Sequence, residues 1–254
     1  MAMADGGDSI LDLALYRREM RHWTRAARRA TSTRPAVLQR QRDRARLLRG
    51  QLDRLICAAD DRLSGVGDAP PSRPHNADWV WTPAAWQTGF ERRGRAPATS
   101  GTGFGENLTL FHDCPRSEIV LRQIPSAAAG AKAVSLDVYA FEGSFLSLAI
   151  DLPEEATRGL RRTHLFRLGC RVASESPLTV YARLNLRHGP NTAQILRELP
   201  DATEPVAIEF DLAYTDFDET RDAKAWIDLI FEHPEMNQIS VHDLSLSRRP
   251  RAQV

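Results

Sequence analysis

Hydrophobic and polar positions alternate along most of the chain between residues 107 and 248. Because successive side chains of a β-strand point to opposite faces, this period of two predicts strands with one buried face. Segments rich in Gly, Pro, Asn and Ser separate the alternating runs, as turns do. We predict strands at 107–112, 117–124, 134–141, 144–152, 163–173, 178–187, 206–214, 223–232 and 238–248. Residues 153–162 predict a short helix, and residues 191–199 fit either a helix or a strand.

The apolar positions of these runs form one consistent core set. The set comprises Leu146, Leu148, Ile150, Leu152, Phe166, Leu168, Cys170, Val172, Leu178, Val180, Ala182, Leu184, Leu186, Val206, Ile208, Phe210, Leu212, Ala225, Ile227, Leu229 and Phe231. Burying such a set, at ~25 cal/mol per Å² of apolar surface, is sufficient to hold one domain together. Many short strands with few helices predict a mainly β fold, an antiparallel jelly-roll β-sandwich.

A period of three and four residues replaces the alternation at the start of the chain. The repeating apolar positions are Leu13, Tyr16, Met20, Trp23, Ala27 and Ala30, then Ala45, Leu48, Leu52, Leu55 and Ala59. These spacings place each set along one side of a helix. The segment "TSTRP" at 31–35 separates the two sets, and Pro35 suits the first turn of a second helix. We therefore predict two amphipathic helices that form a hairpin or pair with another chain.

These patterns divide the chain into three parts. Residues 1–63 are predicted to form an Arg-rich, amphipathic helical hairpin. Residues 64–78, "SGVGDAPPSRPHNAD", are rich in Pro and Gly and read as a linker. Residues 79–254 are predicted to form the β-sandwich domain. The basic helical hairpin therefore precedes the sandwich as an α-helical arm.

Charge is distributed unevenly between these parts. The whole chain has a formal net charge of +1, but residues 1–63 contain 14 arginines against 8 acidic residues. A basic helical arm favours self-association or a protein partner, with peripheral contact to an anionic membrane or to nucleic acid as alternatives. A solvated hairpin that docks on the body of the protein would need no such partner.

Targeting and redox signals favour a cytoplasmic protein. The first ten residues, "MAMADGGDSI", have no apolar core like that of a secretory signal. No apolar run approaches the roughly 18–20 residues that a transmembrane helix needs. Cys57, Cys114 and Cys170 are odd in number and form no CxxC pair, which fits a reducing compartment and predicts no zinc site.

The polar sides of the predicted strands are expected to form one face, and this face mixes residue types that suit sugar recognition. They carry Arg167, Arg171, Tyr181, Arg183, Asn185, Arg187, Asp211, Trp226 and Asp228. Aromatic rings stack on the apolar face of a pyranose, while amide, carboxylate and guanidinium groups bond its hydroxyls. An antiparallel sheet with one wet face also places polar residues there, so an ordinary solvent face or a protein contact is the alternative.

The loop "RHGPNT" at 187–192 adds two candidate recognition residues, His188 and Asn191. Loops at strand ends often carry function. The shape of a Gly-Pro turn accounts for Gly189, Pro190 and Asn191 equally well, so both interpretations stay open.

Signals for catalysis and for metal binding are weak. "FHDC" at 111–114 brings His112, Asp113 and Cys114 together in sequence, as a Cys nucleophile would require, but a turn capped by Asp113 explains the same residues. We predict no enzyme and no cofactor, because no nucleophile motif or paired carboxylates are evident. A structural calcium would use the carboxylate of Asp243 with that of Glu106, Asp113 or Asp151, although no contiguous calcium loop is present.

The chain resembles known families in two ways. "FEGSFLSLAIDLP" and "WIDLIFEHPEMNQISVHDLSLSRR" resemble segments of accessory β-sandwich domains of the carbohydrate-binding-module, galactose-binding-like type. That resemblance implies a jelly roll that binds glycans on a concave face or in end loops, sometimes with a structural calcium. "ALYRREMRHW", "LTLFHDC", "GSFLSLAIDLP", "HGPN" and "FDLAYT" resemble blocks of an uncharacterised alphaproteobacterial family of unknown function, which implies no activity.

These observations predict a non-catalytic cytoplasmic adaptor with a carbohydrate-binding-like sandwich and a basic helical arm for assembly or anchoring. A glycan-binding module that acts on intracellular polysaccharide intermediates is the alternative. A Cys/His hydrolase and a nucleic-acid binder have less support from the sequence.

Overall fold

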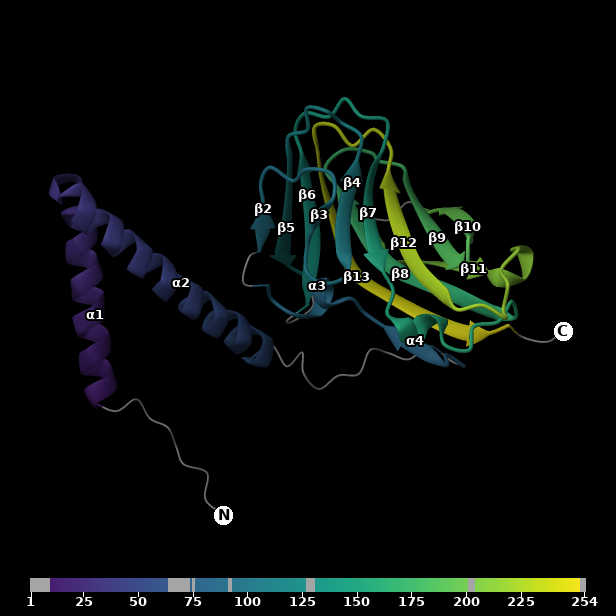
Figure 1. Cartoon of the computed structure of the whole chain (residues 1–254), viewed down its shortest axis with the longest axis horizontal. Helices are drawn as coiled ribbons and strands as arrows, with labels where there is room; N and C mark the ends of the chain where they lie inside the picture. Colours follow the sequence, from purple (N-terminus) through teal and green to yellow (C-terminus); the bar gives the residue numbers. More distant parts are fainter. Residues whose placement is uncertain are drawn as a thin grey trace, which may run out of the picture. The chain divides into compact units, whose positions relative to one another are not determined.

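The computed structural model describes residues 10–63, 74, 76–90, 93–126, 131–200 and 204–251 (Figure 1). The chain divides into two compact units, Met1–Leu55 and Ile56–Val254. Most of the predicted linker, residues 64–73 and 75, lies outside the described residues, so the predicted domain bounds stay a prediction.

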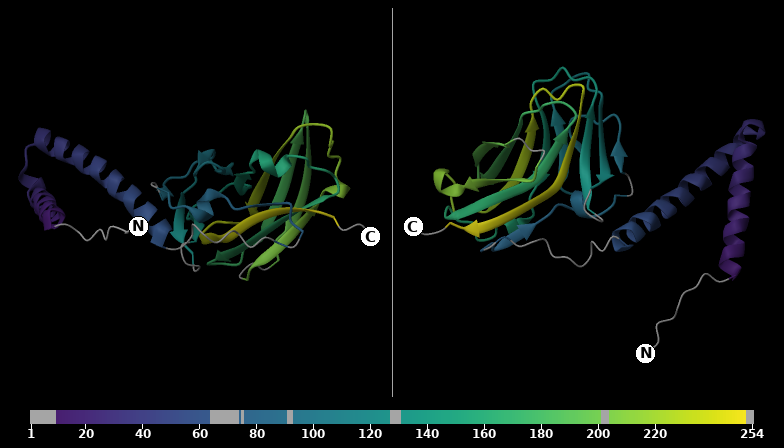
Figure 2. Two further views of the ribbon diagram at one scale, coloured as in Figure 1. Left: turned by 90° about the horizontal axis from the view of Figure 1, so that it is seen from below. Right: turned by 180° about the vertical axis from the view of Figure 1, so that it is seen from behind.

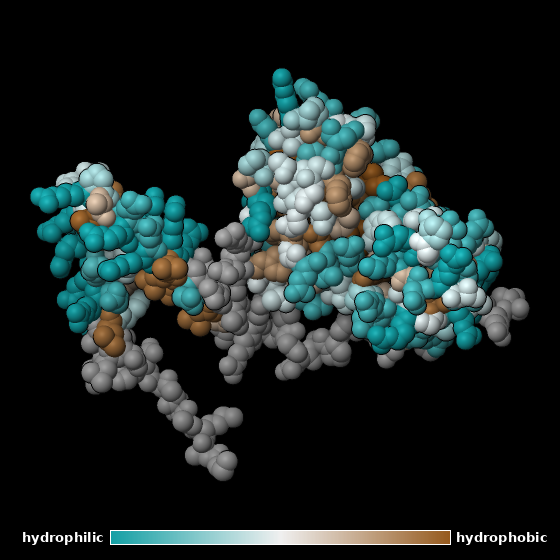
Figure 3. Space-filling view, viewed as in Figure 1, coloured by the Kyte–Doolittle hydropathy of each residue, from teal (hydrophilic) through white to brown (hydrophobic). Residues whose placement is uncertain are grey.

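Two helices and a short 3-10 turn form the start of the described chain, as the sequence predicted. Helix α1 spans Ile10–Arg28, the turn η1 spans Ala30–Ser32, and helix α2 spans Pro35–Leu63. Large apolar side chains lie on the helix surfaces, where Figure 3 shows brown patches among the hydrophilic side chains. The side chains of Leu13 and Cys57 lie outside the described residues. Neither helix is long and apolar enough to cross a membrane, judged over the part of the chain that the structure describes.

Two antiparallel sheets follow and form the predicted sandwich (Figure 2). The first sheet has the order β11 (Val206–Asp211), β8 (His164–Ser174), β13 (Asn237–Pro250), β6 (Lys132–Val138), β5 (Ile119–Pro125) and β2 (Gly94–Arg95), with β1 (Trp79–Trp81) beside β13. The second has the order β10 (Asn191–Glu198), β9 (Val180–His188), β12 (Ala223–Phe231), β7 (Leu146–Asp151), β4 (Leu108–His112) and β3 (Thr102–Gly103). We call them the seven-stranded and the six-stranded sheet. The finer jelly-roll assignment stays a prediction.

The core between the sheets contains the apolar set that alternation selected. Every member is either buried in the core or, as for Leu152, Leu178, Val206 and Ile208, half-buried against it. Trp86 adds a buried anchor from the short helix α3 (Ala84–Gln87), where its Nε1 donates to the Val241 carbonyl oxygen at 2.8 Å.

Three local predictions need correction or completion. The helix predicted at 153–162 is the single turn α4 (Glu154–Thr157). The strand predicted at 206–214 ends at Asp211, because the Asp211 carboxylate accepts the Ala213 amide hydrogen and begins the 3-10 turn η2 (Leu212–Tyr214). The ambiguous segment 191–199 is the edge strand β10, with largely exposed side chains.

The order of the strands determines which side chains share a surface. The chain passes from β8 in the seven-stranded sheet to β9 in the six-stranded sheet, continues into β10, and returns to the first sheet with β11. The polar sides of β8 and β11 therefore lie on one sheet, and those of β9 and β10 on the other.

Candidate functional site

The outer side of the six-stranded sheet carries a group of polar and aromatic residues from three adjacent strands. Because Val180, Ala182, Leu184 and Leu186 point into the core, the alternate side chains of β9 point outward. The register pairs Tyr181 with Ile230, Arg183 with Asp228, Asn185 with Trp226, and Arg187 with Lys224. Gln194 of β10 lies opposite Asn185. We call Tyr181, Arg183, Asn185, Arg187, Gln194, Lys224, Trp226 and Asp228 the polar face.

A buried carboxylate occupies the centre of the polar face. Asp228 is only 5% exposed, and its Oδ2 accepts hydrogen bonds from Arg183 Nη2 at 2.8 Å and Nε at 3.1 Å. Asn185 Nδ2 donates to the same oxygen at 2.9 Å, and Gln194 Nε2 donates to Asn185 Oδ1 at 2.9 Å. A buried charge is costly unless it is paired and hydrogen-bonded, so this network holds Arg183, Asn185 and Asp228 in fixed positions.

Two cations lie side by side at one end of the polar face. Arg187 and Lys224 are directly opposite each other on β9 and β12, and both are exposed. Among the described residues neither of them forms an ion pair. Like charges in a directly opposed pair destabilise a sheet, so this end of the face favours an anion.

A hollow of about 400 Å³ adjoins these cations. It is lined by Asp151, Leu152, Pro153, Glu154, Thr157, Arg187, Ala223, Lys224, Ala225 and Trp226. A second hollow of about 680 Å³ shares Glu154, Thr157, Arg187, Ala223 and Lys224 with the first. The half-buried Trp226 ring therefore borders a recess that contains both cationic and carboxylate groups.

The other end of the polar face carries an aromatic residue among carboxylates. The negative charge of Glu232, then burial, then the charge of Glu198 raise the pKa of Tyr181. The phenol therefore stays protonated at neutral pH and can donate a hydrogen bond. Arg187 lies six positions after Tyr181 along the extended strand, so the face runs about 20 Å from its acidic to its basic end.

Three of the predicted site residues lie in the other sheet, which corrects the expectation of one shared surface. Arg167 and Arg171 lie on β8 and Asp211 ends β11, both in the seven-stranded sheet. Arg171 forms an ion pair with Asp243 at 3.7 Å, and Asp211 pairs with Arg251 at 3.4 Å. Sequence alternation identifies the outward side of each strand but not the sheet to which the strand belongs.

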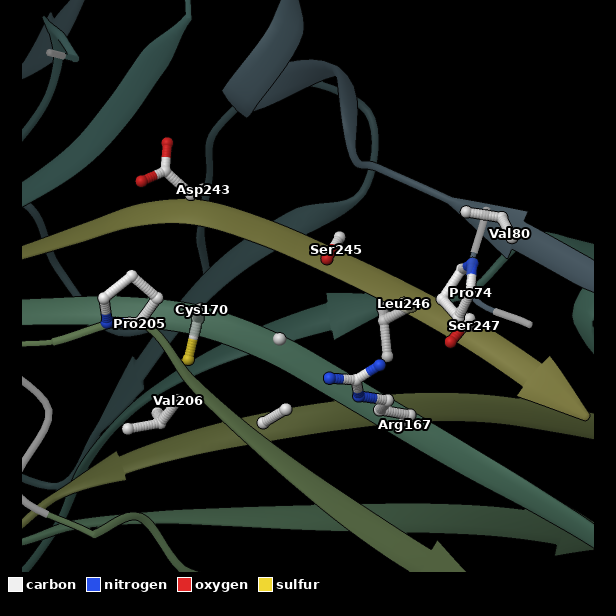
Figure 4. Close-up of a pocket in the computed structure, with 12 residues that line it drawn as sticks. Pro74, Val80, Arg167, Cys170, Pro205, Val206, Asp243, Ser245, Leu246 and Ser247 are labelled. Atoms are coloured by element: carbon white, nitrogen blue, oxygen red, sulfur yellow. The ribbon is translucent and has the colours of Figure 1, made fainter. Parts of the chain in front are cut away.

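Arg167 lines a separate hollow of about 380 Å³ on the seven-stranded sheet (Figure 4). A register shift between His242 and Ser245 bends β13 here, and Asp243 takes a left-handed conformation with φ of 53°. Cys170 also lines the hollow, and burial raises the pKa of its thiol to about 12. The thiol is therefore protonated at neutral pH and is a poor nucleophile.

The two loop candidates are not part of the polar face. His188 is 3% exposed, and its ring packs edge-to-face against Phe217 with centroids 5.5 Å apart. Asn191 begins β10 opposite His188 and is exposed. Both residues therefore lie at the end of the β9–β10 hairpin, with His188 in a packing role.

Residues of the "FHDC" segment hold the loop before β7 in place through hydrogen bonds. The Asp113 carboxylate accepts hydrogen bonds from the Ser144 hydroxyl, the Ser144 amide at 2.7 Å and the Phe145 amide at 3.2 Å. The hydrogen bond from the Ser144 side chain is the main cause of the lowered pKa of Asp113. Cys114 Sγ accepts from the Glu142 amide at 3.1 Å. These contacts favour the interpretation of this segment as a capped turn.

The carboxylates considered for calcium are dispersed. Asp113 is bound to the loop at Ser144, Asp151 borders the Trp226 hollow, and Asp243 pairs with Arg171 in the other sheet. The described residues contain no group of three or more His, Cys, Asp or Glu side chains that could hold a metal ion.

Sequence reasoning missed two members of the polar face. Lys224 is one of only two lysines in a chain whose other basic residues are arginines, and this rarity was the available signal. Gln194 would have been found by assigning 191–199 a period of two, because the register then places it beside Asn185.

Comparison with known proteins gives a family and several structural likenesses. Residues 3–254 match the model of a family of unknown function, DUF6478. No curated protein matches the chain. The fold is similar to the family 11 carbohydrate-binding module of a cellulosomal cellulase from Clostridium thermocellum, with 7% identity, a TM-score of 0.40, and coverage of 63% of this chain and 96% of that one.

Two further solved structures show comparable likeness. A xylan-binding domain from Paenibacillus barcinonensis has 9% identity and a TM-score of 0.37, covering 60% of this chain and 92% of that one. A Stig cyclase from Fischerella has 12% identity and a TM-score of 0.34, covering 72% and 93%. These likenesses assign no ligand or activity to this chain.

Proposed function

This chain belongs to the DUF6478 family of unknown function, and we propose that it is a non-catalytic binding protein whose polar face holds a glycan. The fixed Arg183–Asn185–Asp228 network beside Trp226 is the observation that carries this proposal. An ordinary solvent face has no need of a buried carboxylate at its centre whose Oδ2 accepts three hydrogen bonds. On a ligand-binding face, such a carboxylate holds the donor groups of Arg183 and Asn185 in place, so that they lose little conformational entropy on binding.

The residues around the network supply the contacts that a sugar requires. Trp226 offers a half-buried ring for stacking against a pyranose. The Arg183 side chain is 38% exposed and keeps guanidinium donors beyond those used by Asp228. Asp151 and Glu154 in the adjoining hollow can accept hydrogens from sugar hydroxyls.

The Arg187–Lys224 pair selects among glycans. A carboxylate, sulfate or phosphate substituent would relieve the repulsion between the two cations. We therefore expect acidic glycans to bind more tightly than neutral glycans of the same size. An adaptor role and a cytoplasmic location stay predictions.

A glycan array probed with the full chain tests the proposal. The expected result is binding to acidic oligosaccharides that Trp226→Ala abolishes and that Lys224→Gln weakens selectively for charged glycans. Tyr214→Ala provides the matched control, because Tyr214 is an exposed aromatic residue on η2 outside the polar face.

Two results would oppose the proposal. Equal loss in Trp226→Ala and Tyr214→Ala would show that binding does not use the polar face. A blank array from protein with native circular dichroism would favour the adaptor alternative, in which the polar face contacts another protein.

A further inference from the structure

The helical arm, which we define as α1 and α2, exposes an apolar stripe on each helix. Tyr16 and Met20 of α1 are 62% and 50% exposed, and Leu52 and Leu55 of α2 are 48% and 64% exposed. Their spacings of three and four residues align them along one side of each helix. Large apolar side chains exposed in this way do not stabilise a helix that is surrounded only by water.

Arginines dominate the charged surface of the arm. Residues 17–49 contain twelve arginines and two acidic residues, Glu19 and Asp43, which gives a formal net charge of +10. At 100° per residue, the arginines of α1 fall within an arc of about 100° that flanks the apolar stripe. The arm therefore joins a strongly cationic side to an apolar side on the same helices.

This combination discriminates between the partners that could cover the stripe. A second copy would bring one cationic flank against another, whereas helices that pair through such stripes usually carry complementary charges beside them. Nucleic acid would neutralise the arginines but would leave the leucine stripe in water. An anionic membrane surface satisfies both sides, because its headgroups attract arginine and its acyl boundary receives apolar side chains.

We propose that the helical arm binds the surface of an anionic membrane, with the stripe of each helix in the headgroup region and its arginines at the lipid phosphates. This proposal does not depend on the glycan site of the sandwich. It assigns the arm a peripheral role, and neither helix crosses the bilayer.

Flotation of the full chain with vesicles tests the proposal. We expect binding to phosphatidylcholine vesicles that contain phosphatidylglycerol, weak binding to phosphatidylcholine alone, and a decrease as salt is raised. Replacing Arg18, Arg25 and Arg46 with Gln should lower the partition coefficient on the order of 100-fold, since each basic residue near an anionic surface contributes roughly fivefold. These three arginines form no ion pair with any described residue.

Two further variants make the outcome specific. Arg116→Gln, Arg161→Gln and Arg197→Gln together remove the same charge from exposed positions of the sandwich, and they should change partitioning by about twofold or less. Met20→Gln with Leu52→Gln alters no charge and should weaken partitioning at least about tenfold through lost apolar contact.

Several results would overturn the proposal. Equal loss of binding by the sandwich triple variant and the arm variant would identify net charge as the cause. Unchanged binding by Met20→Gln with Leu52→Gln would show that the stripe stays out of the lipid. Self-association that this double variant abolishes, without binding to anionic vesicles, would show that a second copy covers the stripe.

Discussion

Gly101 and Gly105 have similar backbone conformations but different surroundings. Both have positive φ, +81° and +73°. A Cβ on Gly101 would meet nothing within 4 Å, whereas one on Gly105 would lie 2.5 Å from Phe90 Cζ. The Phe90 ring packs edge-to-face on the buried Phe104, so it cannot yield freely.

Substitution by alanine at these two positions should therefore lower the free energy of unfolding by different amounts. We expect Gly101→Ala to lower the free energy of unfolding by about 1 kcal/mol and Gly105→Ala by about 3 kcal/mol. Urea unfolding of both variants measures the difference. Equal losses would mean that the Phe90 contact adds nothing beyond backbone strain.

His164 gives the protein a pH dependence of known sign. Burial first, and then the positive charge of Arg248, lower the pKa of His164 below its usual 6.5. Its Nδ1 accepts the Arg161 amide hydrogen at 2.9 Å, which requires the neutral ring. At a pH between the pKa of His164 in the folded chain and its higher pKa in the unfolded chain, the unfolded chain binds a proton more readily. The free energy of unfolding must therefore fall as the pH drops through this range.

We expect the free energy of unfolding to decrease as pH falls below about 7, and His164→Gln to reduce that slope. Urea titrations of both proteins across this range supply the measurement. His242, whose pKa burial and Arg171 also lower, leaves part of the slope in the variant. An unchanged slope in His164→Gln would show that His164 is not the titrating group.

At the scale of elements, Arg248 joins three segments that are distant in sequence. From β13, its Nε and Nη2 donate to the two carboxylate oxygens of Asp78, each at 3.1 Å, beside the start of β1. Its Nη1 donates to the Ala156 and Arg158 carbonyl oxygens in and after α4, at 2.8 and 3.0 Å. The Arg248 side chain is buried, whereas the Asp78 carboxylate is partly open to solvent.

Arg248→Met should lower the free energy of unfolding by about 3 kcal/mol, because Asp78 and two carbonyl groups lose a donor. The neighbouring Arg249→Met is the control, since its pair with Glu209 is largely exposed and should contribute less than about 1 kcal/mol. Similar losses in both variants, measured by urea unfolding, would contradict the assigned role of Arg248.

Local periodicity was a reliable guide to the longer elements and a poor one to the short elements. Strands such as β8 and β12 alternate over enough residues for the pattern to exceed chance. The two-residue strands β2 and β3 contain no full period, and their pairing with β5 and β4 alone defines them. Likewise, the Asp211 cap that ends β11 is a hydrogen bond that an apolar pattern does not record.

At the scale of the whole molecule, the candidate site could be predicted only in part. Alternation placed Tyr181, Arg183 and Asn185 on one side of β9, and the register confirms Trp226 and Asp228 beside them. Assignment of Arg167 to the same surface was wrong, because strand pairing is set by contacts between residues distant in sequence. The buried state of Asp228 likewise depends on three strands meeting.

Membrane and glycan binding should be separable, because the arm and the polar face use different residues. We expect Trp226→Ala to leave vesicle flotation unchanged, and the arm variant lacking Arg18, Arg25 and Arg46 to leave glycan binding unchanged. Running both assays on both variants checks this. Loss of both activities in either variant would show a general folding defect or a coupled site.

Calorimetric titration of the strongest acidic glycan from the array into the full chain tests whether the polar face is the glycan site. We expect measurable binding by the unmodified protein and by Arg167→Gln, whose altered residue lies on the other sheet. Trp226→Ala should weaken affinity at least about tenfold, as loss of a stacking contact implies. Equal affinity in Trp226→Ala and the unmodified protein would contradict the assignment of the glycan site to the polar face.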